Sequence, residues 1–239
     1  MDNLLFVSLV IFLAVFTQSL TGFGSALVAM ALLPALIGIR AATPLVALVG
    51  LTIEIALLLR YHAAFRLQSV WRLAAASVVG IPLGLLVLRQ VDERIVLAIL
   101  GGVLVGYSVY ALLGLRLPPS KSTAWAYGTG LLAGMLGGAY NTSGPPVVIY
   151  GDAQRWPPAE FKSNLQGFFF VTNIFVIAGH ALSGNLTRLV WVGYLWVLPA
   201  IALGILLGTR LDGRINPVVF RKLVLILLIV MGARMIFWG

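Results

Sequence analysis

Long apolar stretches separated by short polar gaps run along almost the whole chain. Several of them exceed the ~18 residues that a helix needs to cross a bilayer. This pattern predicts an all-α polytopic membrane protein with seven to eight transmembrane helices. The apolar segments that we expect to form them cover residues 3–39, 43–59, 70–88, 95–115, 124–151, 164–182, 189–209 and 217–238, with a polar loop at 152–162.

Two of these segments are interrupted by glycine, proline and small polar residues, at 17–25 and at 134–146. Proline removes a backbone donor and disfavours helix in the residue before it, so we expect broken helices. Whether each forms a discontinuous span, a re-entrant hairpin or two spans stays open. Broken helices at membrane depth line protected cavities, where transporters use the freed backbone groups to hold a solute. The candidate substrate-binding residues in the breaks are Thr21, Gly22, Gly24, Asn141, Thr142, Ser143, Gly144 and Pro145.

The two halves of the chain match each other at one constant offset. Gly144 lies 120 residues after Gly24, and Asp212 lies 120 residues after Asp92. The matches predict two homologous repeats, each beginning with a broken helix. The predicted units are a first transmembrane repeat at 1–115, a linker at 116–123 and a second transmembrane repeat at 124–239.

Polar side chains recur inside the sixth apolar segment. Gln166, Asn173 and His180 are seven residues apart, which places them on one helix face. That face should point inward, because lipid makes polar groups costly. For Gln166 and Asn173 we expect either solute contact or interhelical hydrogen bonds, worth about 0.6 kcal/mol each. His180 lies near the end of its segment, where an interfacial position and titration near neutral pH are expected.

Glu54 is the carboxylate that the pattern places deepest in an apolar segment, on a stripe with Thr43, Ala47 and Gly50. An intramembrane carboxylate is a candidate functional group by default. Glu54 and His180 are therefore the candidates for proton coupling. Pairing with a buried basic residue, or a shallow solvated position, are the alternatives for Glu54.

Composition restricts the function further. The chain has 239 residues, of which 61% are hydrophobic and 10% charged, and this excludes an ordinary soluble domain. It lacks cysteine and has two isolated histidines, which argues against a metal site or a thiol enzyme. No nucleotide-binding or hydrolase motif is present, so we expect no enzyme activity and no cofactor.

The net charge of +9 comes mostly from basic residues in the gaps between segments. The positive-inside effect explains such charge without nucleic-acid binding. Counting eight single crossings places most basic gaps on one side of the membrane, including those with Arg155, Lys162 and Arg210. The same count places Arg60 and Arg66 on the opposite side.

The chain resembles the TauE/SafE family of membrane permeases, often described as sulfite exporters. The resemblance rests on the segment from Gln18 through Gly22, Phe23 and Gly24, on the glycine-rich block ending in Gly144-Pro145-Pro146, and on the matched Asp-x-Arg turns. It implies a two-repeat permease of the bacterial inner membrane that exports small sulfur-containing anions such as sulfite or organosulfonates.

The sequence thus predicts a secondary membrane transporter, with a small anionic solute and the lipid bilayer as its partners. A channel-like anion pore and a membrane scaffold without transport are the alternatives. Substrate, coupling ion, direction of transport and formation of a homodimer are left open by the sequence.

Overall fold

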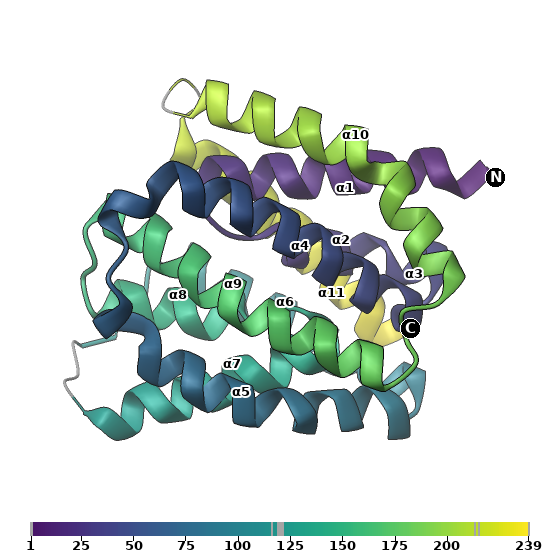
Figure 1. Cartoon of the computed structure of the whole chain (residues 1–239), viewed down its shortest axis with the longest axis horizontal. Coiled ribbons are helices and arrows are strands. Elements are labelled where there is room, and N and C mark those ends of the chain that lie inside the picture. Colours follow the sequence, from purple (N-terminus) through teal and green to yellow (C-terminus); the bar gives the residue numbers. More distant parts are fainter. Residues whose placement is uncertain (1, 116, 119–121, 213, 215, 239) are drawn as a thin grey trace.

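The computed structural model describes residues 2–115, 117–118, 122–212, 214 and 216–238, and every regular element within them is a helix (Figure 1). Residues 116 and 119–121 of the predicted linker lie outside the described part. The helices are α1 (Asp2–Thr21), α2 (Ser25–Leu32), α3 (Pro34–Ile37), α4 (Ile39–Tyr61), η1 (His62–Ala64), α5 (Leu67–Gln90), α6 (Glu93–Leu112), α7 (Thr123–Tyr140), α8 (Gly144–Ala153), α9 (Pro158–Leu182), α10 (Arg188–Leu211) and α11 (Pro217–Trp238).

Six helices among the described residues are long and apolar enough to cross a membrane, namely α1, α4, α5, α6, α9 and α10. Helix α7 is rich in glycine, and α11 carries the three basic residues Arg221, Lys222 and Arg234. These two therefore do not count as uninterrupted apolar spans. The prediction of an all-α polytopic membrane protein is confirmed, whereas the expected seven to eight spans exceed the six that length and composition support.

Helix α1 ends at a turn from which the short helix α2 runs back beside it. The turn contains Gly22 and Gly24, whose φ angles of 86° and 104° favour glycine. The Gly22 amide donates to the Gln18 carbonyl at 2.7 Å, which closes the end of α1. Local glycine chemistry therefore reverses the chain inside an apolar segment.

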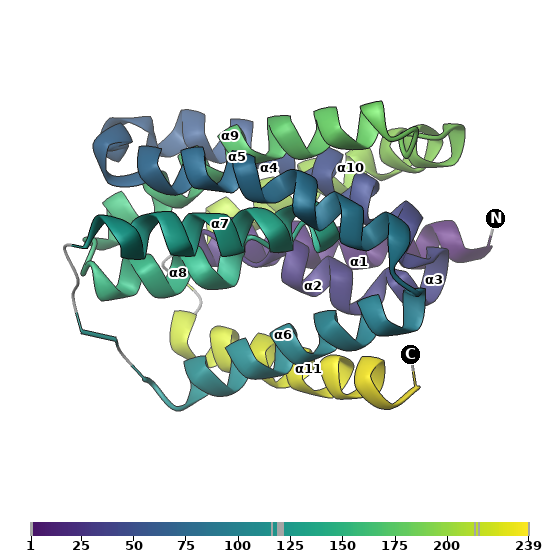
Figure 2. The same cartoon turned by 90° about the horizontal axis from the view of Figure 1, so that it is seen from below.

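Helix α7 is followed by a second reversal, from which α8 runs back (Figure 2). Asn141 has φ 53°, a left-handed conformation that asparagine tolerates at the end of a helix. The amides of Asn141 and Thr142 then donate to the carbonyls of Gly137 and Leu136, at 2.8 and 3.2 Å. Two prolines occupy the first turn of α8, where a missing N–H costs little.

The loops after α4, α8 and α10 lie at the same end of the molecule. The Tyr61 hydroxyl donates to Asp212 at 3.0 Å, and Lys162 forms an ion pair with Asp212 at 2.9 Å. The Arg66 amide donates to the Asn164 side chain at 2.9 Å. These contacts bring together three loops that follow different helices.

The sequence-based assignment of Arg60 and Arg66 to the side opposite Arg155, Lys162 and Arg210 was therefore wrong. The count treated residues 124–151 as one crossing. In the structure, α7 enters from one end and α8 returns to it, so the side on which the later loops lie is reversed (Figure 1).

Close helix pairs join the two halves of the chain. Helix α5 packs along α7, and α10 packs along α1. A Cβ atom on Gly134 would collide with the Ser77 carbonyl, and one on Gly208 would lie 2.5 Å from the Ser19 Cβ. Small residues allow such close approach between membrane helices. Helices α4 and α9 pack together between these pairs and carry the polar residues described next.

Candidate functional site

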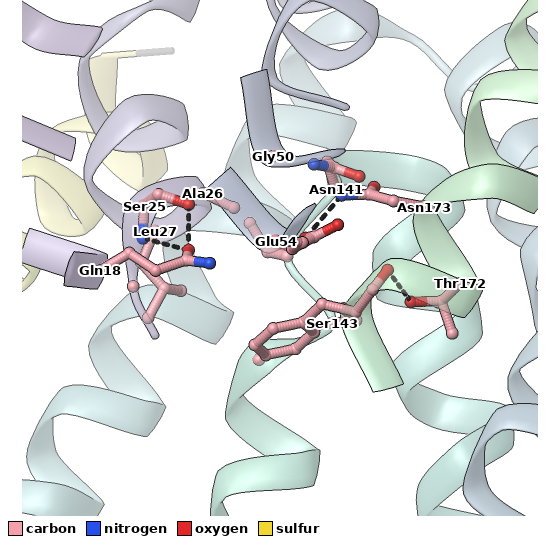
Figure 3. Close-up of a pocket in the computed structure, with 14 residues that line it drawn as sticks. Gln18, Ser25, Ala26, Leu27, Gly50, Glu54, Asn141, Ser143, Thr172 and Asn173 are labelled. Atoms are coloured by element: carbon pink, nitrogen blue, oxygen red, sulfur yellow. Dashed lines mark hydrogen bonds between the residues drawn. The ribbon is translucent and has the colours of Figure 1, made fainter. Parts of the chain in front are cut away.

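The two chain reversals line one small cavity of about 30 Å³ inside the molecule (Figure 3). Residues 24–27 contribute the first reversal and the start of α2, and residues 141–144 contribute the second reversal and the start of α8. Gly50 and Glu54 of α4 and Asn173 of α9 complete its polar wall. Elements from both halves of the chain are therefore needed to form the cavity.

The N-termini of two helices face this cavity, because the residues of their first turns line it. The first amides of a helix lack internal partners and carry the positive end of its dipole. Neither α2 nor α8 has a side-chain hydrogen bond at its N-cap residue, although the first amide of α2, that of Ser25, donates to Gln18 Oε1 at 3.3 Å. The arrangement offers backbone donors to a negatively charged group placed between the two helices.

Two buried polar atoms on the cavity have no hydrogen-bond partner among the described residues. The Thr142 side chain is 0% exposed and its Oγ1 atom is unpaired. Glu54 is 3% exposed and its Oε2 atom is unpaired, while Oε1 accepts from the Asn173 side chain at 2.7 Å. Buried polar groups in proteins nearly always have a partner, so these two atoms indicate a polar occupant.

Gly50 makes room for the polar wall. A Cβ atom there would lie 2.6 Å from Asn173 Nδ2, 3.4 Å from Glu54 Oε1 and 3.6 Å from Asn141 Nδ2. The amides of Asn141 and Asn173 and the Glu54 carboxyl are therefore gathered around one glycine (Figure 3). Any larger residue at position 50 would push this cluster apart.

The first reversal is held by side chains that do not all reach the cavity. Gln166 Nε2 donates to the Gly22 carbonyl at 2.6 Å, and Gln166 Oε1 accepts from Gln18 at 3.1 Å. Gln18 Oε1 in turn accepts from the hydroxyl of Ser25 and, at 3.3 Å, from its amide. Gln166 thus clamps the first reversal from α9.

The structure brings seven of the predicted site residues to the cavity and leaves five away from it. Those lining it are Gly24, Glu54, Asn141, Thr142, Ser143, Gly144 and Asn173. Those outside its lining are Thr21, Gly22, Pro145, Gln166 and His180. The Thr21 hydroxyl donates to the carbonyls of Thr17 and Phe23 at 2.9 and 2.6 Å, which makes it part of the turn itself.

The three polar residues of α9 all face inward, as their spacing predicted, with Gln166, Asn173 and His180 0%, 5% and 0% exposed. His180 lies two residues before the end of α9, and its expected interfacial position stays a prediction. Its ring is buried and hydrogen-bonded to the Asn185 side chain at 3.0 Å. For Glu54 the burial contradicts a solvated position, and the partner of its carboxyl in the described structure is the Asn173 amide rather than a basic residue.

Sequence reasoning missed several cavity residues. Gln18 and Ser25 lie within the first interruption, and Gly50 lies on the same helix stripe as Glu54. The sequence pattern could therefore have identified all three as cavity residues. Thr172 adjoins Asn173, but its hydroxyl bonds back to the Phe168 carbonyl at 3.0 Å. Phe169 gave no signal, because an aromatic residue in an apolar segment is unremarkable.

Six membrane-length helices among the described residues make this a multi-pass membrane protein, and an internal polar cavity is a feature that membrane transporters share. The protein family described as sulfite exporter TauE/SafE matches residues 7–235, so the chain belongs to that family and is a transporter rather than an enzyme.

Among curated proteins, the chain is similar to the probable sulfite/organosulfonate exporter TauE of Cupriavidus necator. The two are 28% identical over 227 residues, which cover 90% of this chain and 87% of the relative. No solved structure matches the chain.

Proposed function

We propose that the protein is a secondary transporter that exports small sulfur-containing anions such as sulfite or organosulfonates. The observation that carries the proposal is the convergence of two helix N-termini and two unpartnered polar atoms on one buried cavity. The family membership and the name of the relative support the substrate class. The solute oxygens would accept hydrogen bonds from the backbone amides of α2 and α8.

Side chains of the second reversal would complete the solute shell. Asn141 and Thr142 supply an amide and a hydroxyl donor, and Ser143 a second hydroxyl. The 30 Å³ cavity has room for about two waters, so it is too tight for a solvated anion. The structure then represents a closed state, which fits alternating access better than a permanently open pore.

The proposed architecture is a pair of inverted repeats, 1–115 and 124–239, joined by the linker 116–123, with α1–α2 and α7–α8 as the broken helices. Adding 120 to the bounds of α4, Ile39–Tyr61, gives 159–181, against Pro158–Leu182 for α9. Likewise α5, Leu67–Gln90, gives 187–210, against Arg188–Leu211 for α10. The exchanged packing of α5 on α7 and α10 on α1 is what an inverted duplication produces.

The proposed orientation of the protein in the membrane rests on the distribution of its basic residues. The loops joined by the Lys162–Asp212 ion pair carry more basic residues than the opposite end, which includes the contact between Glu93 and the Ile39 amide at 3.3 Å. Basic loops stay in the cytoplasm. Export would then start from the end that carries Lys162.

Glu54 is the proposed coupling residue, because it is the charged side chain among the residues that line the cavity. An ionised carboxylate would repel an anion in the same cavity. Protonation of Glu54 would remove this repulsion and turn its unpaired oxygen into a hydrogen-bond donor. The solute and one proton would therefore enter the cavity together.

The test is flux out of proteoliposomes loaded in turn with sulfite, sulfoacetate, sulfate and a carboxylate, with and without an imposed pH gradient. We expect saturable movement of a sulfur oxyanion that follows the proton gradient and loses this dependence in Glu54→Gln. The matched control is Glu160→Gln, outside the cavity, which should behave like the wild type. Movement of none of the four solutes would contradict the proposed function.

A further inference from the structure

A second and larger cavity, of about 1030 Å³, opens at the end of the molecule that carries the basic loops. It lies between the end of α6 with the described residues that follow it as far as Pro118, the loop after α8, and the start of α11, and we call it the vestibule. Its lining includes Asp152, Arg155 and Arg221. The two arginines outnumber the single aspartate, so the charged side chains that line the vestibule have a net positive charge. A positive lining attracts anions.

A narrow cavity of about 20 Å³ lies between the vestibule and the central cavity. It shares Arg221 with the vestibule, and it shares Gly24 and Leu27 with the central cavity. The three cavities therefore adjoin one another through shared lining residues, in the order vestibule, narrow cavity and central cavity. Arg221 stands at the first junction in this series.

Phe23, at the tip of the first reversal, lines the narrow cavity and is 8% exposed. Its ring centroid lies 5.7 Å from the Arg221 guanidinium carbon and 6.3 Å from the ring centroid of Tyr107. An aromatic side chain packed in this way blocks the passage of a hydrated anion. Movement of the first reversal would carry Phe23 with it.

Two buried polar atoms at this junction, Arg221 Nε and the Tyr107 hydroxyl, make no hydrogen bond of standard geometry within the described residues, although the two side chains lie near enough to pair with each other. A guanidinium is suited to oxyanions, because its parallel N–H groups can donate to two oxygens at once. Both atoms are thus suited to an oxygen-rich anion arriving from the vestibule.

We propose that the vestibule is the entrance for small oxyanions, that Arg221 and Tyr107 bind the anion at its inner end, and that Phe23 closes the path onward in this state. As an entrance for the exported solute, the site rests on the proposed function. As an anion site, it is testable without transport.

The test uses the absence of native cysteine in the chain. Ala111→Cys places one thiol in the vestibule lining, where methanethiosulfonate reagents carrying a sulfonate or a trimethylammonium group can compete. Relative to their rates with a free thiol, we expect the anionic reagent to be favoured by about tenfold. Adding Arg221→Gln should abolish this preference, whereas the exposed neighbour Lys222→Gln should leave it intact.

The proposal would be overturned if neither reagent labelled the Ala111→Cys thiol, or if the thiol showed no preference for the anionic reagent. It would also be overturned if Arg221→Gln and Lys222→Gln reduced that preference equally. In proteoliposomes, Arg221→Gln should raise the half-saturating sulfite concentration about tenfold at the vestibule end and leave the other end unchanged. An equal rise at both ends would contradict a role at the entrance. Retained labelling preference without any wild-type sulfite flux would sink the proposed function while supporting the anion site.

Discussion

Backbone hydrogen bonds close both chain reversals, but the two differ in how their side chains are hydrogen-bonded. The first is tied down by side chains, with Gln166 on the Gly22 carbonyl, Gln18 on Ser25 and Lys162 on the Leu20 carbonyl at 3.2 Å. The second is closed by its own backbone, and the Thr142 hydroxyl has no partner in the described structure.

This contrast suggests a mainly structural role for the first reversal and a solute-binding role for the second. A reversal whose polar groups are already satisfied has little left to offer a solute, whereas an unsatisfied buried hydroxyl costs free energy until something binds it. We infer that the first reversal chiefly supplies a positioned helix N-terminus, and that the second also supplies the side-chain donors. Five substitutions, grouped in four experiments, test this difference.

Thr142→Val should have the largest effect, and it should be on transport. A hydrogen bond to a charged solute is worth about 1.5–3 kcal/mol, so sulfite flux at low concentration should fall about tenfold to hundredfold. Thermal unfolding should not shift downward, because the lost hydroxyl has no protein partner. Normal flux in a well-folded Thr142→Val protein would remove the second reversal from the solute site.

Gln166→Leu should show the converse pattern. It leaves the Gly22 carbonyl and the Gln18 side chain without their partner, at a cost of about 1–3 kcal/mol in stability. The thermal unfolding temperature in detergent should fall, while the half-saturating sulfite concentration of the folded protein stays near the wild-type value. A change in that concentration with unchanged stability would assign Gln166 to the solute instead.

Gly22→Ala and Gly144→Ala form a matched pair, one in each reversal. At Gly22 the φ of +86° and the Lys162 side chain 2.9 Å from a new Cβ predict a loss of about 1–2 kcal/mol. Gly144 is helical, and its new Cβ would meet Phe169 at an ordinary 3.9 Å. Unfolding temperatures should therefore drop for the first variant only, and equal drops would mean that both turns are equally constrained.

Lys162→Met should have the smallest effect. Lys162 and Asp212 are 21% and 29% exposed, and partly solvated ion pairs contribute about 0–1 kcal/mol. The difference in unfolding temperature from the wild type should shrink further at high salt, since salt screens the wild-type pair. A large, salt-independent loss would show that the bond from Lys162 to the Leu20 carbonyl matters more than the ion pair.

Local sequence chemistry predicted much of this molecule. Glycine and proline identified both reversals, and the seven-residue spacing placed Gln166 and Asn173 on the buried face of α9. Such signals are readable because backbone preferences and helix periodicity act over a few residues.

The side-chain contacts between the two halves of the chain could not be predicted from the sequence. Glu54 meets Asn173 across 119 positions of sequence, and Gln18 meets Gln166 across 148. Nothing in the neighbouring sequence specifies these partners, because the first pair depends on how α4 and α9 pack and the second on where the end of α1 lies relative to α9. The side of the Arg60 loop was misassigned for a related reason, since hydropathy alone does not distinguish a segment that crosses from one that returns.

The central claim is that an oxyanion binds between the N-termini of α2 and α8, beside Thr142. The most direct test is the thermal unfolding temperature of the purified protein in increasing sulfite, for the wild type and for Asn141→Ala. A ligand that binds only the folded state at a hundred times its Kd stabilises it by about 2.7 kcal/mol. For the wild type we expect an unfolding temperature that rises with the logarithm of the sulfite concentration above Kd, and a strongly reduced rise in the variant. The same rise in both proteins, or none in the wild type, would contradict the claim.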